Sequence, residues 1–223
     1  ARGHLAVGQT RVPCIRGWDS RPWVTLVGRG LPFWRLFYPR LPARFPKQFA
    51  GVDVEQFYAA VNKAQPSLIR IEADEVTYGM HVILRFELEQ DIINGRVELK
   101  DLPQRWAEKM DEYLGIEVTD HAHGVLQDMH WASGLIGYFS TYLLGTVMSV
   151  QIWEKADDEL GGLDDQIERG EFEPLREWLG EKIHSQGRKY VPQELLRHAT
   201  GSTIDAKPYL AYLTRKFGAP VAA

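Results

Sequence analysis

Apolar residues recur at helical spacing along most of the chain, and glycine or proline ends most of these runs. From about Val52 onward the spacing follows a period near 3.6 residues, and no stretch alternates apolar and polar residues long enough for a sheet. The segments predicted as regular helices are 54–64, 101–114, 173–186, 192–200 and 205–217. The sequence therefore predicts an all-α fold.

Capping residues support these boundaries. Asp101 precedes the 101–114 run as an N-cap, Pro103 lies in its first turn, and Gly115 follows its last apolar residue. The 173–186 segment carries a narrow apolar stripe, so we expect it at the surface.

Segment 69–93 differs because it is apolar nearly all the way round, which predicts a buried helix. It nevertheless carries one stripe of polar residues at spacings of three or four, namely Arg70, Asp74, Tyr78, His81 and Arg85. Buried groups of this kind need partners. They form either an internal ion-pair seam or the wall of a polar cleft.

Segment 124–131 leads into an uncharged run, 131–153. We predict a second polar face there, formed by Gln127, His130, Gly134, Tyr138 and Tyr142. A lone histidine beside an apolar helix is usually a core residue, but two polar stripes on buried helices favour a shared cleft. The run is long enough to span a bilayer, yet its three glycines and the polar remainder of the chain favour a buried core helix.

Composition places the chain among soluble globular proteins. It has 223 residues, of which 44% are hydrophobic and 25% charged, with a formal net charge of −4. The single cysteine, Cys14, excludes an intramolecular disulfide and a cysteine-based zinc cluster, so we expect a reducing compartment. The mild acidity argues against binding of nucleic acid or membranes by bulk charge.

The first 50 residues break this balance. Their formal charge is about +8, against about −12 for the remainder, and they hold half of the twelve prolines. A nucleic-acid arm, a targeting peptide and a segment that has lost its original constraint are the three explanations. The many aromatic residues there fit neither of the first two, and no secretory signal is recognisable.

Catalytic motifs are scarce. The sequence contains no H-E-x-x-H, G-x-S-x-G, P-loop, dinucleotide fingerprint or C-x-x-C. His121 and His123, preceded by Asp120, form an H-x-H pair that fits either a surface metal or, more commonly, a solvated loop.

Two long motifs make the chain recognisable. IRIEADEVTYGMHVILRFELE (69–89) and GVLQDMHW (124–131) resemble signature motifs of the carboxypeptidase Taq family, the thermostable carboxypeptidase 1 type of zinc metallocarboxypeptidase. The resemblance runs from about Leu26 to the C-terminus. It implies a single helical domain over 26–223, the C-terminal portion of a helix-rich, zincin-like enzyme, preceded by an unmatched, basic, irregular segment over 1–25.

The resemblance also implies general properties. Family members are cytosolic, typically homodimeric and zinc-dependent, and they remove C-terminal residues from peptides. They are longer than this chain on the N-terminal side, where the H-E-x-x-H helix and a further glutamate ligand lie. Gly17 stands where that glutamate is expected. With none of the three ligands or the general base, we expect this chain to bind no catalytic zinc.

The resemblance also implies roles for individual residues at matching positions of the motifs. Arg70 resembles the arginine that binds a substrate's terminal carboxylate. Tyr138 or Tyr142 lies where the family places a tyrosine able to stabilise the oxyanion. The motif match assigns further cleft-wall positions to Tyr78, His81, Gln127, Asp128 and His130.

Three functions remain open at this stage. The chain is a truncated, inactive carboxypeptidase homologue with a peptide-binding or regulatory role, one half of a split enzyme, or a remnant without function. A frameshift or truncation would explain the basic start. We expect a cytoplasmic protein without nucleic-acid or membrane partners, which self-associates as a homodimer because half a fold leaves apolar surface uncovered.

Overall fold

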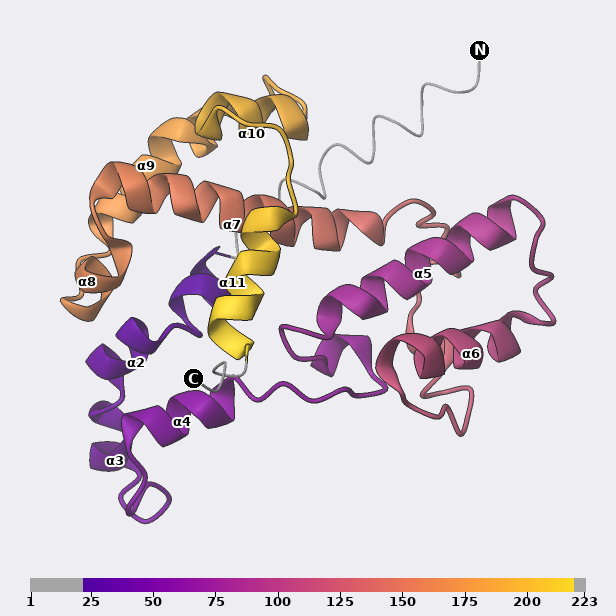
Figure 1. Cartoon of the computed structure of the whole chain (residues 1–223), viewed down its shortest axis with the longest axis horizontal. Helices are drawn as coiled ribbons and strands as arrows, with labels where there is room; N and C mark the ends of the chain where they lie inside the picture. Colours follow the sequence, from indigo (N-terminus) through magenta and orange to yellow (C-terminus); the bar gives the residue numbers. More distant parts are fainter. Residues whose placement is uncertain (1–21, 219–223) are drawn as a thin grey trace. The chain divides into compact units, whose positions relative to one another are not determined.

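The computed structural model describes residues 22–218. These residues form helices joined by turns and loops, without a β-strand among them, which confirms the all-α prediction (Figure 1). Contacts divide the chain into two compact units. The first comprises residues up to Asn62 and from Gly145 onward, and the second comprises 63–144.

The first unit is built around the long helix α7 (Ser140–Leu160), most of which belongs to it. Its other helices are α2 (Leu31–Phe37), α3 (Arg40–Arg44), α4 (Val54–Val61), α8 (Leu163–Glu168), α9 (Glu173–Lys182), α10 (Pro192–Thr200) and α11 (Lys207–Phe217), with a π-helical turn at Pro22–Val27 and a 3₁₀ turn at His184–Gln186. Met148 and Ile152 of α7 pack in one core with Leu179 of α9 and Leu196 of α10.

The second unit is smaller. It contains α5 (Tyr78–Ile93), α6 (Leu102–Leu114) and the 3₁₀ turns η2 (Arg70–Glu72) and η3 (Val125–Gln127). Its core consists of Leu84 and Leu88 from α5 with four residues of α6 spaced four apart, which are Leu102, Trp106, Met110 and Leu114. Spacing of four keeps side chains on one helix face, so α6 buries a single stripe against α5.

Helix ends follow the capping residues closely. Gly115 and Gly201 end α6 and α10 in the left-handed region, at φ 64° and 81°. Asp53 begins α4 with a capping box to Gln56. Asp101 occupies the N-cap of α6, although its side chain makes no capping hydrogen bond.

The predicted helix over 69–93 is wrong in its first part. Arg70 lies in η2, and the backbone then becomes extended at Ala73. The Asp74 carboxylate accepts hydrogen bonds from the backbone N–H groups of Val76 and Thr77, at 2.8 and 3.0 Å. These local bonds compete with helical ones, so α5 begins only at Tyr78. The predicted single stripe from Arg70 to Arg85 therefore does not lie on one helix.

The predicted helix over 131–153 is also wrong in its first part. Gly134 and Gly137 adopt φ values of 71° and 78°, which right-handed helices exclude, and α7 begins at Ser140. His130 and Tyr138 lie in the turns before it. From Gly145 to Ile152 every residue of α7 is buried, as predicted for a core helix.

Within the described part of the chain, no helix combines the length and apolar character needed to cross a membrane. Gly17, which stands at the expected position of a zinc ligand, and most of the basic start lie outside the described residues.

Candidate functional site

The carboxylate of Asp128 joins two arginines of the second unit. Nη2 of Arg70 donates to Oδ1 at 2.6 Å and Nε donates to the same carboxylate at 3.2 Å, while Nε of Arg85 donates to Oδ2 at 2.5 Å. Charge-assisted bonds of this kind are the strongest hydrogen bonds in proteins. Burial opposes ionisation of Asp128, but the hydrogen bonds from Arg70 and the charge of Arg85 hold the pKa of this carboxyl group below its ordinary value.

Gln127 connects the segments that carry the ion cluster of Arg70, Arg85 and Asp128. Its Oε1 accepts from the backbone N–H of Arg70 at 2.9 Å and from Nη2 of Arg85 at 2.8 Å. Its Nε2 donates to the carbonyl oxygens of Leu68 and His123, at 3.0 and 2.9 Å. One amide therefore ties the 124–131 motif to the segment before α5.

Arg85 is fully buried, and each of its three nitrogen atoms donates a hydrogen bond. Its third donor group, Nη1, donates to the carbonyl oxygen of His81 at 2.8 Å. Its guanidinium carbon lies 4.5 Å from the centre of the Trp106 ring, a cation–π contact. Burial lowers the pKa of Arg85 to about 10, so the group stays protonated at neutral pH.

His81 is also fully buried. Its Nδ1 lies 3.5 Å from Nη1 of Arg85, and its Nε2 is buried without a hydrogen-bond partner among the described residues. Burial and the charge of Arg85 lower the pKa of His81 to about 4, so the imidazole is neutral at pH 7.

Aromatic side chains form the other side of the cluster. Nε2 of His130 lies 3.0 Å from the hydroxyl oxygen of Tyr142, and the guanidinium carbon of Arg70 lies 5.3 Å from the Tyr142 ring centre. Tyr138 packs edge-on against Tyr142, with ring centres 5.2 Å apart. Burial raises the pKa of Tyr142 to about 12 and lowers that of His130, so both are neutral at pH 7.

The ionised groups of this cluster do not cancel. Within the hydrogen-bonded trio, Arg70 and Arg85 carry two positive charges against the single negative charge of Asp128. His81 is neutral, and the buried carboxylate of Glu89, which also acts on His130, is bonded outside the trio to Trp131 and Gly137. Nη1 of Arg70 is directed to the hydroxyl oxygen of Tyr78, 3.5 Å away. An excess positive charge of this kind favours a small anion such as a carboxylate.

The predicted site residues all lie in this one region, although neither predicted helix face is continuous: of the first stripe, only Tyr78, His81 and Arg85 lie on α5. Hydrogen bonds or ring contacts join Arg70, Tyr78, His81, Gln127, Asp128, His130, Tyr138 and Tyr142 through Arg85 and Asp128 or through the aromatic side. Asp74, by contrast, bonds to the backbone of the turn that precedes α5.

Two residues of this region were not predicted as site residues. Arg85 was recognised only as part of a polar stripe. Glu89, which lies four residues later on α5, accepts from Nε1 of Trp131 at 2.8 Å and from the backbone N–H of Gly137 at 2.7 Å. A buried arginine and glutamate four residues apart on an apolar helix are the signal that could have identified them.

A zinc site does not fit the described residues. Across 22–218, no three His, Cys, Asp or Glu side chains are grouped so that they could hold a metal ion. His123 of the H-x-H pair instead lies on the surface, with Nδ1 2.6 Å from Oδ2 of Asp120.

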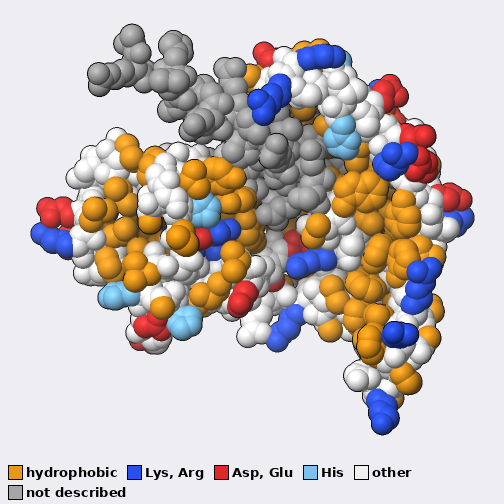
Figure 2. Space-filling model, turned by 180° about the vertical axis from the view of Figure 1, so that it is seen from behind, with side chains coloured by type: hydrophobic (Ala, Val, Ile, Leu, Met, Phe, Trp, Pro, Cys, Tyr) orange, Lys and Arg blue, Asp and Glu red, His pale blue; other side chains and the backbone are white. Residues whose placement is uncertain are grey.

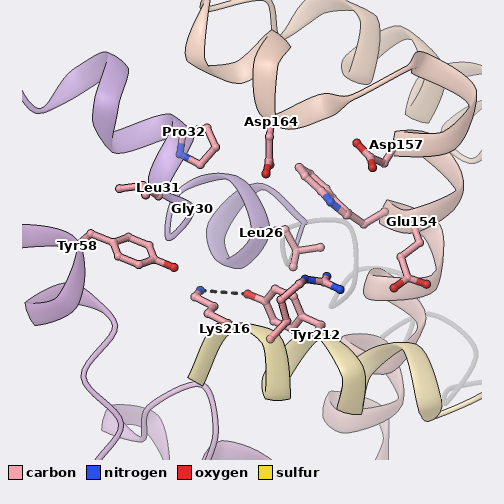
Figure 3. Close-up of a pocket in the computed structure, with 12 residues that line it drawn as sticks. Leu26, Gly30, Leu31, Pro32, Tyr58, Glu154, Asp157, Asp164, Tyr212 and Lys216 are labelled. Carbon is pink, nitrogen blue, oxygen red and sulfur yellow. Dashed lines mark hydrogen bonds between the residues drawn. The ribbon is translucent and has the colours of Figure 1, made fainter. Parts of the chain in front are cut away.

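A separate cavity of about 540 Å³ lies in the first unit (Figure 3). The acidic residues Glu154, Asp157 and Asp164 line it together with Lys216, whose Nζ donates to the Tyr212 hydroxyl at 3.0 Å. No residue of the two motifs lines this cavity, so it is distinct from the candidate site.

Comparison with known proteins finds relatives that are carboxypeptidases. The chain is 46% identical over 201 residues to thermostable carboxypeptidase 1 of Thermus thermophilus, covering 90% of this chain and 39% of that protein. It is 38% identical over 199 residues to thermostable carboxypeptidase 1 of Pyrococcus furiosus, covering 89% and 40%. The chain thus spans about two fifths of the length of these relatives.

Solved structures that resemble this chain include a carboxypeptidase. The M32 carboxypeptidase from Deinococcus radiodurans R1 superimposes with a TM-score of 0.90 at 40% identity, covering 92% of this chain and 42% of that one. The model of the carboxypeptidase Taq (M32) metallopeptidases matches residues 5–217, so the match begins well before Leu26. This chain therefore belongs to the carboxypeptidase Taq (M32) metallopeptidase family.

Proposed function

We propose that these 223 residues form the part of a carboxypeptidase cleft that binds the C-terminal carboxylate of a peptide, and that they do not cleave peptides on their own. The observation that supports binding is the shared use of Asp128. Because one carboxylate serves two guanidinium groups, the ion cluster keeps one excess positive charge, which a carboxylate would complement.

In this proposal Arg70 is the contacting group. Asp128 holds its Nε and Nη2 atoms, which fixes the plane of the guanidinium and leaves the Nη1 side directed to Tyr78. A fixed fork loses little entropy on binding. Tyr142 is protonated at neutral pH, and its hydroxyl oxygen lies 3.0 Å from Nε2 of His130 beside this arginine.

The sequence supports the second part of the proposal, that these residues alone do not cleave peptides. A catalytic zinc of this family requires an H-E-x-x-H helix, which the 223 residues lack, and Gly17 stands where the third ligand is expected. Metal analysis and a peptidase assay on the purified chain test this part. We expect neither stoichiometric zinc nor release of C-terminal residues, and finding both would refute it.

Carboxylate binding is tested with a matched pair of ligands. Calorimetry compares N-acetyl-Ala-Phe with its C-terminal amide, which differ only at the group in question. We expect the acid to bind about tenfold more tightly than the amide, and Arg70→Met to abolish the difference. Arg105→Met, which removes an equal charge from an exposed ion pair with Glu108, is the control. Equal binding of acid and amide by the unmodified chain would refute the proposal.

The length of the relatives supports a second candidate. Since the chain covers 39% of the Thermus thermophilus protein, the remaining part could supply the zinc site if both were present together. Mixing this chain with the purified N-terminal part of that relative tests the idea. Peptidase activity that appears only in the mixture favours it, and an inactive mixture that forms a stable complex contradicts it.

A further inference from the structure

Arg85 is closed to solvent, yet its charge lies next to the Arg70–Asp128 pair. Its side chain is fully buried, and its three nitrogen atoms donate to Asp128, Gln127 and the carbonyl oxygen of His81. Each nitrogen atom thus has an acceptor within the protein. Arg85 therefore acts on a bound molecule only through its neighbours.

The neighbour that matters is Asp128. If Arg85 were uncharged, Asp128 would face Arg70 alone, and this pair would have no net charge. A carboxylate approaching Arg70 would then meet the repulsion of Asp128 at nearly the same distance as the attraction of the guanidinium. With Arg85 present, that repulsion is offset by a second positive charge in a buried, weakly screened position.

We propose that Arg85 is a positioning residue that sets the charge of the site: by sharing Asp128 it keeps Arg70 both oriented and electrostatically free to bind an anionic ligand. This inference rests on the proposed carboxylate binding. It assigns the preference for a charged peptide end to two arginines, of which only Arg70 contacts the peptide. The protonated state of Arg85 at neutral pH agrees with this role.

A purely structural role for Arg85 makes a different prediction. Arg85 also connects α5 to the 124–131 motif through Gln127, so its loss could distort the site. Distortion would weaken acid and amide peptides alike. Loss of charge weakens only the acid, so the ratio of the two affinities separates the roles.

The experiment measures that ratio for two substitutions at one position. Arg85→Met removes the charge and keeps an apolar side chain of similar length. Arg85→Lys keeps the charge, but a single ammonium group cannot serve Asp128, Gln127 and the His81 carbonyl together. Calorimetry with N-acetyl-Ala-Phe and its amide gives the affinities, and circular dichroism checks that each variant is folded. Arg105→Met again controls for the change in net charge.

We expect Arg85→Met to lower the acid-to-amide ratio about tenfold with little change in amide binding, and Arg85→Lys to keep most of the ratio. The inference is overturned if Arg85→Met keeps the ratio of the unmodified chain, or if Arg85→Lys loses the ratio or fails to fold. Should Arg85→Met itself fail to fold, Arg85→Lys decides. Failure of the proposed function is distinguishable, because the unmodified chain would then show no preference for the acid.

Discussion

Asp128 and Arg70 are 58 residues apart in the sequence, yet Oδ1 of Asp128 lies 2.6 Å from Nη2 of Arg70. The two family motifs therefore meet through an ion pair, not through a shared helix. The pair is nearly buried, with side-chain exposures of 10% for Asp128 and 8% for Arg70. Whatever the site binds, this contact holds its two halves together.

Asp128→Asn should strongly destabilise the chain. The substitution leaves two buried guanidinium groups without an anion, a situation that costs about 3–5 kcal/mol in other proteins. Urea unfolding at pH 7 measures the loss in free energy of unfolding. Asp91→Asn breaks a more exposed ion pair with Arg96 and is expected to cost less than about 1 kcal/mol. Similar losses for the two variants would contradict the central role of Asp128.

His81 predicts a pH dependence of stability. Its pKa is about 4 in the folded chain, against an ordinary value of 6.5. The unfolded state therefore binds the proton more tightly, so His81 favours folding fully above pH 6.5 and this stability is lost as the pH falls from 6.5 to 4. The shift corresponds to about 3 kcal/mol.

Urea unfolding between pH 7 and pH 4.5 tests this expectation. His81→Phe should flatten the part of the curve below pH 6.5, because phenylalanine cannot take up a proton. His121→Asn, at an exposed position of the same unit, should leave the curve unchanged. A curve with the same slope in His81→Phe as in the unmodified chain would exclude His81 as its cause.

Glu89 predicts a local change in the 129–139 turns. Its two oxygen atoms accept from Trp131 Nε1 and the Gly137 backbone, which fastens these turns to α5. Glu89→Ala removes both acceptors and is expected to cost about 1.5–3 kcal/mol, whereas Glu89→Gln keeps one oxygen and should cost less. The rate of hydrogen exchange at the Gly137 amide measures how well these turns are ordered. Unchanged protection of this amide in Glu89→Ala would show that the contact does not order the turns.

Exposed apolar residues predict self-association. Hydrophobic side chains reach the surface on the face shown in Figure 2. In the second unit, Ile93, Leu99 and Ile136, with exposures of 63%, 72% and 47%, line an apolar groove. We expect sedimentation to show a dimer or larger species that Leu99→Lys shifts toward the monomer, with Leu210→Lys in the first unit as control. A monomer at every concentration would exclude this surface as an association site.

The sequence predicted helix ends well where a single residue determines the backbone. Gly115 and Gly201 end α6 and α10 because a left-handed residue closes a helix whatever surrounds it.

The sequence failed where local bonds interrupt an apolar run. Asp74 and the glycines at 134 and 137 break two predicted helices, although the hydrophobic pattern continues through both breaks. Spacing alone cannot show such a break, because a turn side chain that bonds to its own backbone leaves the pattern of polarity intact. The site residues were found through the motif resemblance, and Arg85 and Glu89 were missed because a buried charge on an apolar helix reveals its partners only in three dimensions.

The central claim, that Arg70 is the contact for a peptide carboxylate, is tested most directly by ¹H–¹⁵N NMR of its side chain. The Nε–H signal of Arg70, assigned by its loss in Arg70→Lys, is followed during titration with N-acetyl-Ala-Phe and with its amide. We predict that the acid shifts this signal in a saturable way and that the amide does not. No shift with the acid, or equal shifts with both ligands, would contradict the claim.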